Sequence, residues 1–195
     1  MTLQEEGQLL AALEAGSEVA FRQLVEEYQD QVVNTCLGFV PNLQDAEDIA
    51  QEVFIEIYRS ISKFRQDAKL STWIYRIAVT KSLEFIRHRK RKKRAAFFQS
   101  LIGLEDDRLK GVQDGFNHPG YQLENQDLAK ILYTAIEKLS DNQRTAFTLN
   151  QSDGLSVKEV AEIMDLSVSA VEALVHRARK NLRKQLQSYY EKDML

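Results

Sequence analysis

Apolar residues recur every three or four positions along most of the chain, and this spacing predicts an all-α protein. The first predicted helix covers residues 17–39, where Ser17 can cap the N-terminus and Pro41 and Asn42 interrupt the pattern afterwards. The most regular pattern follows directly, with apolar side chains on one face at Ala46, Ile49, Ala50, Val53, Phe54, Ile57, Tyr58 and Ile61. The opposite face of this helix is acidic.

A polar segment at residues 65–69 separates that helix from the next one, which Ser71 or Thr72 is expected to cap. The helix runs through apolar positions into residues 87–94, where seven of eight residues are Arg or Lys. Such a run repels itself, so it needs counter-charges or stays extended. Trp73 falls on the apolar period, and we expect it in the core rather than stacked on a base.

Residues 95–124 lose the helical period and hold glycines, a proline and several acids, which predicts a flexible linker. An apolar patch inside it, formed by Phe97, Phe98, Leu101 and Ile102, either docks on another surface or belongs to a poorly ordered loop. Helical spacing then returns, and Ser140 with Asp141 is expected to begin a further helix.

A helix-turn-helix motif is predicted near the C-terminus. Ser156 and Glu159 fit the capping-box pattern at the start of a short helix, and Asp165 stands at the turn, where a left-handed backbone is needed. Ser167 or Ser169 can cap the second helix. The side chains expected to be buried are Val160, Ala161, Ile163 or Met164, Leu166, Val171, Leu174 and Val175. The second helix of such a motif can enter a DNA major groove, whereas the alternative is an ordinary pair of packed helices.

Charge is distributed very unevenly, although the net charge of the 195 residues is only −3. Residues 1–62 hold 12 acidic and 2 basic residues, whereas residues 63–94 hold 2 acidic and 12 basic ones. Such a swing suggests two partners of opposite charge, one basic and one polyanionic, such as a nucleic acid. The alternative is that both are solvated helix faces.

Other features exclude several classes of protein. Cys36 is the single cysteine, so no intrachain disulfide can form, and no apolar run reaches the ~18–20 residues that span a membrane. The acidic N-terminus lacks the features of a signal peptide. The three histidines show no metal-ligand spacing, and no glycine-rich phosphate loop is present, so we expect neither an enzyme nor a cofactor or metal site.

Two parts of the chain together resemble the extracytoplasmic-function (ECF) sigma factors of the sigma-70 family. The first reads DAEDIAQEVFIEIYRSISKF over residues 45–64 and LSTWIYRIAV over residues 70–79, followed by the basic run. The second reads AIEKLSDNQRTAFTLNQSDGLSVKEVAEIMDLSVSAVEALVHRARKNLRK over residues 135–184. The occurrence of both parts in this order makes the resemblance specific. The linker segment between them does not resemble the family.

The resemblance implies two small helical domains joined by a flexible linker, with sigma region 2 over residues 1–94, the linker over 95–124 and a region 4 helix-turn-helix domain over 125–195. It implies a factor that binds core RNA polymerase through the clamp helices of the largest subunit. Such a factor recognises the minus-ten and minus-thirty-five elements, helps to melt promoter DNA and directs transcription initiation of a specific regulon. An anti-sigma factor and a location in the bacterial cytoplasm are also implied.

The same resemblance, together with charge and helix position, indicates three sets of candidate residues. The polymerase-binding set is acidic and polar: Asp45, Asp48, Gln51, Glu52 and Glu56. The minus-ten set combines basic, aromatic and hydroxyl groups, which hold an opened strand: Phe64, Arg65, Lys69, Ser71, Thr72, Tyr75, Arg76, Thr80, Lys81, Glu84, Arg87, Arg89, Lys90 and Arg91. The minus-thirty-five set lies on the helix-turn-helix: Ser156, Ser167, Ser169, Ala170, Glu172, Ala173, His176, Arg177, Arg179 and Lys180, with Arg183 and Lys184 behind it for phosphates.

Two points stay open from the residues alone. Glu172 can accept a hydrogen bond from a cytosine amino group, or it can be an ordinary exposed helix residue.

A one-component regulator, with a sensing or dimerising N-terminal half, would carry the same helix-turn-helix. It would bind an intact duplex without polymerase, whereas a sigma factor would bind DNA weakly on its own.

Overall fold

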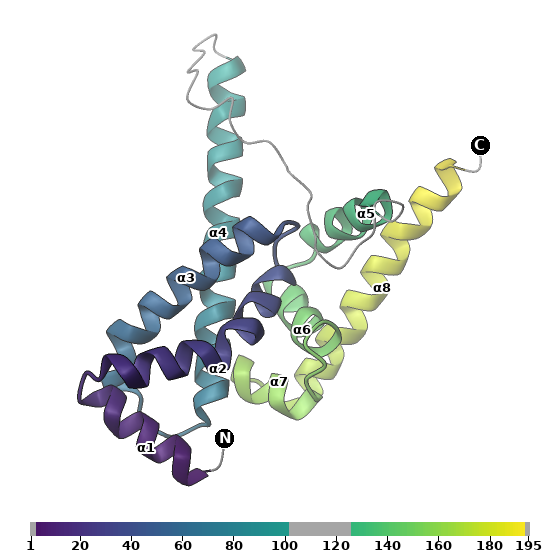
Figure 1. Ribbon diagram of the computed structural model, residues 1–195. Helices are drawn as coiled ribbons and strands as arrows, with labels where there is room; N and C mark the ends of the chain where they lie inside the picture. The colour runs from purple at the N-terminus through teal and green to yellow at the C-terminus, as the bar shows by residue number, and fades with distance from the viewer. Residues whose placement is uncertain (1–2, 102–125, 194–195) are drawn as a thin grey trace.

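The computed structural model describes the backbone of residues 3–101 and 126–193, with the side chains of residues 5–96 and 130–187. In this part of the chain there are α-helices and one 3-10 turn but no strand, which confirms the all-α expectation (Figure 1). In chain order the elements are α1 (Leu3–Glu14), α2 (Glu18–Leu37), α3 (Leu43–Ser60), η1 (Ile61–Lys63), α4 (Leu70–Leu101), α5 (Gln126–Glu137), α6 (Asp141–Gln151), α7 (Val157–Met164) and α8 (Val168–Asp193).

Helices α1 to α4 form an N-terminal domain around one apolar core. Leu24, Val53, Ile57 and Ile74 are completely or almost completely buried in it, and each such side chain contributes about 1.5–3 kcal/mol by leaving water. Helix α1, which the apolar period did not predict, adds Leu9, Leu10 and Leu13 to this core. Trp73 packs against the same core, as expected.

The helix starts of this domain are capped by side chains. Ser17 Oγ accepts a hydrogen bond from the amide of Ala20 at 3.3 Å, as its position predicted. The expected cap of α4 by Ser71 or Thr72 is wrong, because that helix already begins at Leu70. The Leu70 amide donates to Oε1 of Glu6 at 3.0 Å, so a residue of α1 closes the start of α4.

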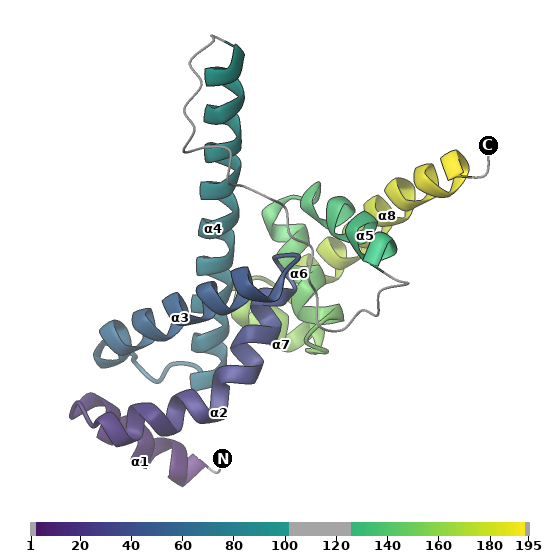
Figure 2. The same ribbon diagram turned by 45° about the horizontal axis from the view of Figure 1, so that its top comes forward.

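Helix α4 is longer than the sequence pattern indicated. It continues to Leu101, seven residues beyond the limit expected for the first domain. Its last turns extend past the neighbouring helices in both views (Figures 1 and 2). Ile102 and the rest of the expected linker to residue 124 lie outside the described residues, as do the side chains of Phe97, Phe98 and Leu101.

Helices α5 to α8 form a C-terminal domain, and α7 with α8 makes the predicted helix-turn-helix. The capping box is present: the Glu159 amide donates to Ser156 Oγ, and Glu159 Oε2 accepts from the Ser156 amide at 2.8 Å. The hydroxyl and the amide of Ser156 both donate to Glu159 Oε2, and these two bonds hold the pKa of the Glu159 carboxyl below its usual range. Asp165 is left-handed (φ 53°, ψ 49°), as predicted.

The turn of this motif corrects one expectation. Leu166 was expected to be buried between the two helices, but its side chain is 39% exposed. Its backbone closes the turn instead, because the Leu166 amide donates to the carbonyl of Ala161 at 3.0 Å. Ser167, rather than Ser169, caps α8, since its Oγ accepts from the amide of Ala170 at 3.2 Å.

A buried arginine joins α5 to α6. Arg144 is fully buried; its Nε donates to the carbonyl of Ile136 at 3.3 Å and its Nη2 to the carbonyl of Glu137 at 2.7 Å. These carbonyls end α5, so the guanidinium satisfies groups that the helix itself leaves free. Burial lowers the pKa of Arg144 from its usual value, but the group keeps its charge because that value is very high.

The two domains touch. Tyr75 and Val79 of α4 pack against the buried residues of α6, α7 and α8. The close approach places the predicted helix-turn-helix beside the first half of α4 (Figure 1). This contact could not be anticipated from a chain pattern that suggested a long linker.

Candidate functional site

The acidic face of α3 is only partly open to a partner. Asp48, Gln51 and Glu52 are exposed, as a docking face requires. Asp45 and Glu56, by contrast, pair with bases of α4: Asp45 Oδ2 lies 2.9 Å from Nη1 of Arg89, and Glu56 Oε2 lies 3.0 Å from the Lys81 ammonium. The Lys81 ammonium holds the pKa of the Glu56 carboxyl below its usual range. These pairs join α3 to α4.

A groove of about 720 Å³ lies between α3 and α4 and brings the acidic and basic segments together. Its lining comes from α3 on one side and α4 on the other: Asp48, Ile49, Gln51, Glu52, Lys81, Glu84, Phe85, Arg87, His88 and Arg91. The groove therefore contains residues from two expected sets, the polymerase-binding set and the minus-ten set. His88 belongs to neither set, although its helical spacing from Glu84 could have placed it there.

Two residues of the expected minus-ten set are buried in the structure. Phe64 is only 9% exposed, and its ring centre lies 5.2 Å from that of Trp73. Thr72 is only 6% exposed. Phe64 belongs to the N-terminal core, and Thr72 is one of the buried polar residues of α4.

The remaining members of this set lie on or near the surface. The exposed ones are Arg65, Lys69, Arg76, Thr80, Glu84, Arg87, Lys90 and Arg91, and the half-buried ones are Ser71, Tyr75, Lys81 and Arg89. Several of them already contact the C-terminal domain, including Tyr75, which packs against its core, and Lys90, whose Nζ donates to the carbonyl of Glu137 at 3.4 Å. Arg76 donates to the carbonyls of Ile163 and Glu162 at the end of α7, and Arg87 pairs with Asp141 at 2.7 Å.

The helix-turn-helix presents the third set. Its exposed members are Ser156, Ser167, Ser169, Glu172, His176, Arg177, Arg179 and Lys180, while Ala170 and Ala173 are half-buried. His176, Arg179, Lys180 and Arg183 line one shallow groove of about 470 Å³ along α8. Small and polar side chains thus lie near the start of α8, where they suit contacts with the edges of DNA bases. Basic side chains follow them along the helix, where they suit contacts with phosphates.

Metal and membrane features are absent from the described residues. No group of three or more His, Cys, Asp or Glu side chains in residues 5–96 and 130–187 is arranged to hold a metal ion. Within the same part of the chain, no helix has a long enough apolar stretch to cross a bilayer.

The geometry defines a class: a helical protein whose C-terminal domain carries a helix-turn-helix and whose N-terminal domain combines an acidic face with a long basic helix. Family comparison agrees. Sigma-70 region 2 matches residues 24–92, and Sigma-70, region 4 matches residues 129–182.

Individual relatives span nearly the whole chain. The ECF RNA polymerase sigma factor SigW of Bacillus subtilis is 36% identical over 173 residues, covering 88% of this chain and 91% of that protein. The ECF RNA polymerase sigma-E factor of Escherichia coli K12 is 32% identical over 179 residues, covering 92% of this chain and 93% of that protein. The chain belongs to the ECF sigma factors of the sigma-70 family.

A solved structure supports the fold. The sigma factor RpoE, in complex with the anti-sigma factor NepR from Bartonella quintana, superposes with a TM-score of 0.56 at 22% identity, covering 86% of this chain and 96% of that one. As a sigma factor, the protein is a transcription initiation factor that acts with core RNA polymerase at promoter DNA, and it is not an enzyme.

Proposed function

We propose that Asp48, Gln51 and Glu52 form the polymerase-docking face. Their common exposure on one side of α3 is the observation that carries this assignment. An acidic face speeds the encounter with a basic partner and fixes its orientation. Asp45 and Glu56 support that face indirectly, because their ion pairs with Arg89 and Lys81 fix the position of α3 against α4.

Promoter contacts divide between the two domains. The exposed residues from Arg65 to Arg91 hold the opened minus-ten strand. Tyr75 is available to stack on a nucleobase, and the Arg and Lys side chains of α4 contact phosphates. The α8 face from Ser167 to His176 reads the minus-thirty-five element, with Ser156, Arg177, Arg179 and Lys180 on the phosphate backbone. These two assignments follow from exposure and charge on elements of the matching family regions.

An anti-sigma factor is the second partner that we propose. The sigma factor RpoE was solved with the anti-sigma factor NepR, and the similar fold supports a partner of this kind here. The protein acts in the bacterial cytoplasm, because that compartment holds both the polymerase and the chromosomal DNA.

The test of the docking face is run-off transcription with core polymerase on a promoter library, using a charge-reversal variant. Asp48→Lys with Glu52→Lys should reduce polymerase capture and transcription at least tenfold. The matched control is Glu26→Lys with Asp30→Lys on α2, which has the same spacing and the same change in charge at exposed positions. Equal capture by the two variants would remove the assignment of the α3 face.

The same library tests the helix-turn-helix. The wild type should enrich one pair of promoter motifs, and Glu172→Gln should alter the preference at a single position of the upstream motif, because the amide presents a different donor and acceptor pattern. Tight binding to an intact duplex without polymerase, combined with no response to polymerase, would instead favour the one-component regulator.

A further inference from the structure

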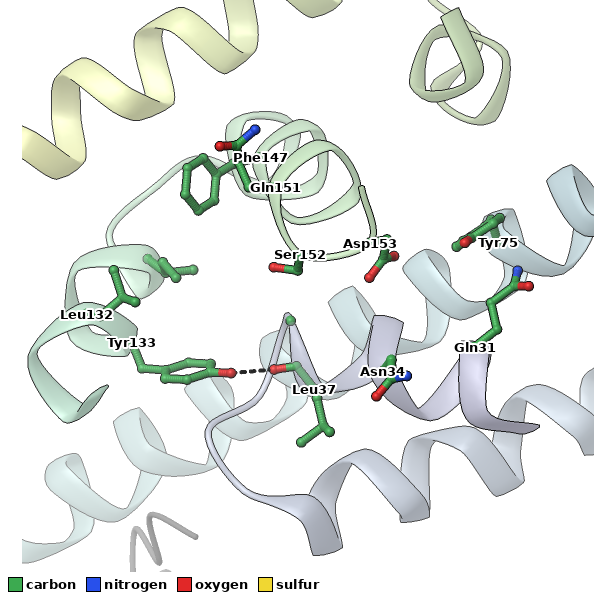
Figure 3. Close-up of a pocket in the computed structure, with 12 residues that line it drawn as sticks. Gln31, Asn34, Leu37, Tyr75, Leu132, Tyr133, Phe147, Gln151, Ser152 and Asp153 are labelled. Carbon is green, nitrogen blue, oxygen red and sulfur yellow. Dashed lines mark hydrogen bonds between the residues drawn. The ribbon is translucent and has the colours of Figure 1, made fainter. Parts of the chain in front are cut away.

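A cavity of about 710 Å³ lies between the N-terminal and C-terminal domains (Figure 3). Its wall comes from α2, Gly38 and Tyr75 of α4 on one side, and from α5, α6 and the two residues after α6 on the other. Sites for small molecules have volumes of ~300–1,000 Å³ and a mostly apolar lining with a few polar groups. Apart from Tyr75, the lining holds no residue assigned to polymerase or DNA, so its chemistry needs a separate explanation.

The two ends of the cavity differ in chemistry. At one end Figure 3 shows the rings of Tyr133 and Phe147, with Leu132 beside them. At the other end it shows the polar side chains of Gln31 and Asp153. A molecule that fills the cavity and satisfies both ends therefore needs an apolar body and a polar head.

Asp153 carries the charge of the polar end. Of the twelve described residues that line the cavity, none is Arg, Lys or His, and no basic side chain in the described part of the chain forms an ion pair with this carboxyl. Burial raises the pKa of Asp153 to about 6, and above that pH the group is ionised. Taking a carboxylate out of water costs free energy unless a cation pairs with it. A ligand can supply the missing positive charge.

An ammonium group fits this end of the cavity. It has three hydrogen-bond donors and no acceptor, and the side-chain oxygens of Gln31 and Asn34 are acceptors in the same lining as Asp153. Oδ2 of Asp153 already accepts from the Thr35 hydroxyl at 2.9 Å, which orients the carboxyl and leaves Oδ1 for a ligand. Tyr75 lies at the same end in Figure 3, where its ring can attract the same cation.

We propose that the cavity is a binding site for a small primary amine with an aromatic body, an arylalkylamine. The ammonium group donates to Oδ1 of Asp153 and to the neighbouring side-chain oxygens, and the aromatic body lies among Leu132, Tyr133 and Phe147. A hydrogen bond between two charged groups is stronger than one between neutral groups, so the cation binds better than a neutral molecule of the same shape. An anion of that shape is repelled by the carboxylate. Neither polymerase nor promoter DNA is needed for this binding, so the site stands apart from the proposed function.

The test compares three ligands of nearly the same shape on the full-length protein. Tryptamine is a cation, tryptophol is neutral and indole-3-acetate is an anion. Saturation-transfer NMR titrations give their dissociation constants at about pH 8, where Asp153 is ionised. Tryptamine should bind with a Kd of about 1 mM or below, as suits a ligand of this size. Tryptophol should bind at least about tenfold more weakly, and indole-3-acetate more weakly still.

Asp153→Asn tests the source of this preference. The substitution removes the charge but keeps an acceptor oxygen for the Thr35 hydroxyl, so the preference for tryptamine over tryptophol should disappear. Asp30→Asn is the matched control, because it removes the same charge at an exposed position of α2 outside the cavity. It should bind all three ligands as the wild type does. An equal loss of preference in Asp30→Asn would show that tryptamine responds only to the overall charge of the protein, and would overturn the site.

A second pair of variants tests the location. Asn34→Trp adds a bulky ring at an exposed position of the lining and should weaken tryptamine binding at least about tenfold, because it fills the cavity. Gln29→Trp adds the same ring at an exposed position of the same helix outside the lining, and should leave binding unchanged. Equal affinity of the wild type for the three ligands would contradict the proposal, as would tryptamine binding that persists in both Asp153→Asn and Asn34→Trp.

Discussion

Oγ1 of Thr35 lies 2.9 Å from Oδ2 of Asp153 and equally 2.9 Å from the carbonyl of Gln31. The Thr35 hydroxyl has a single proton, which it shares between the Gln31 carbonyl and the Asp153 carboxylate, and its bond to Asp153 lowers the pKa of that carboxyl less than burial raises it. Burial raises the pKa of Asp153 to about 6. The groups that face it, Tyr75 of α4 and Cys36 of α2, have pKa values raised to about 12 mainly by burial, so they stay neutral.

Contact between the two domains, which places Asp153 of the C-terminal domain against Thr35 of α2, should therefore be favoured by acid. The form in which the domains touch is called closed here, and the form in which they are apart is called open. In the open form Asp153 is exposed and its pKa falls towards its usual 3.8, so the closed form binds the proton more tightly. Stability of the closed form is then greatest below about pH 4 and declines as the pH rises through about 6. Between pH 5 and pH 7 the ratio of closed to open protein should fall about tenfold, as measured by energy transfer between dyes on Gln23→Cys and Asn142→Cys, which are exposed positions in the two domains.

Asp153→Asn is the control for this prediction. The amide keeps an acceptor oxygen for the Thr35 hydroxyl and does not titrate, so the pH dependence of the closed fraction should disappear. A pH response that persists in Asp153→Asn would show that another group is responsible.

Glu6 should stabilise the N-terminal domain through the start of α4. Glu6→Ala removes the acceptor of the Leu70 amide and should lower the free energy of unfolding by about 1 kcal/mol, as for the loss of a helix cap. Glu6→Gln keeps an acceptor oxygen and should lose less. Urea unfolding measures both, with Glu14→Ala at an exposed position of the same helix as the control.

Arg144 should matter more to stability than any other arginine among the described residues, because it is fully buried. Arg144→Ala leaves a cavity and removes one donor from each of two carbonyls at the end of α5, so the free energy of unfolding should fall by about 3–4 kcal/mol. The exposed Arg177→Ala should change it by less than about 0.5 kcal/mol. A loss in Arg144→Ala as small as in the control would contradict this role.

The end of the basic run should set part of the salt dependence of DNA binding. Lys92 and Arg94 are exposed on the projecting part of α4. Replacing both with Gln should reduce the slope of log K against log salt by about 2 on duplex DNA, or about 1.4 on an opened strand. Arg22→Gln with Lys138→Gln, also exposed, removes the same charge elsewhere and should leave the slope unchanged, as measured with the polymerase-bound factor.

Local patterns predicted local structure well. The Ser156–Glu159 capping box, the left-handed Asp165 and the Ser17 and Ser140 caps all depend on residues within a few positions of one another. The burial of Phe64 was missed because it stands between Lys63 and Arg65, and only the packing of the N-terminal core covers it. The burial of the polar Thr72 likewise depends on tertiary packing.

The sequence by itself determined the helices, the helix-turn-helix and the separation of charge, because helical spacing and capping act within one or two turns of the chain. Only the tertiary structure decided that Glu6 begins α4, that Asp45 and Glu56 pair with α4, and that Gly38 lies against Thr148. These contacts join residues that are between 25 and 110 positions apart. Such pairs depend on how whole helices pack, and no local periodicity encodes that.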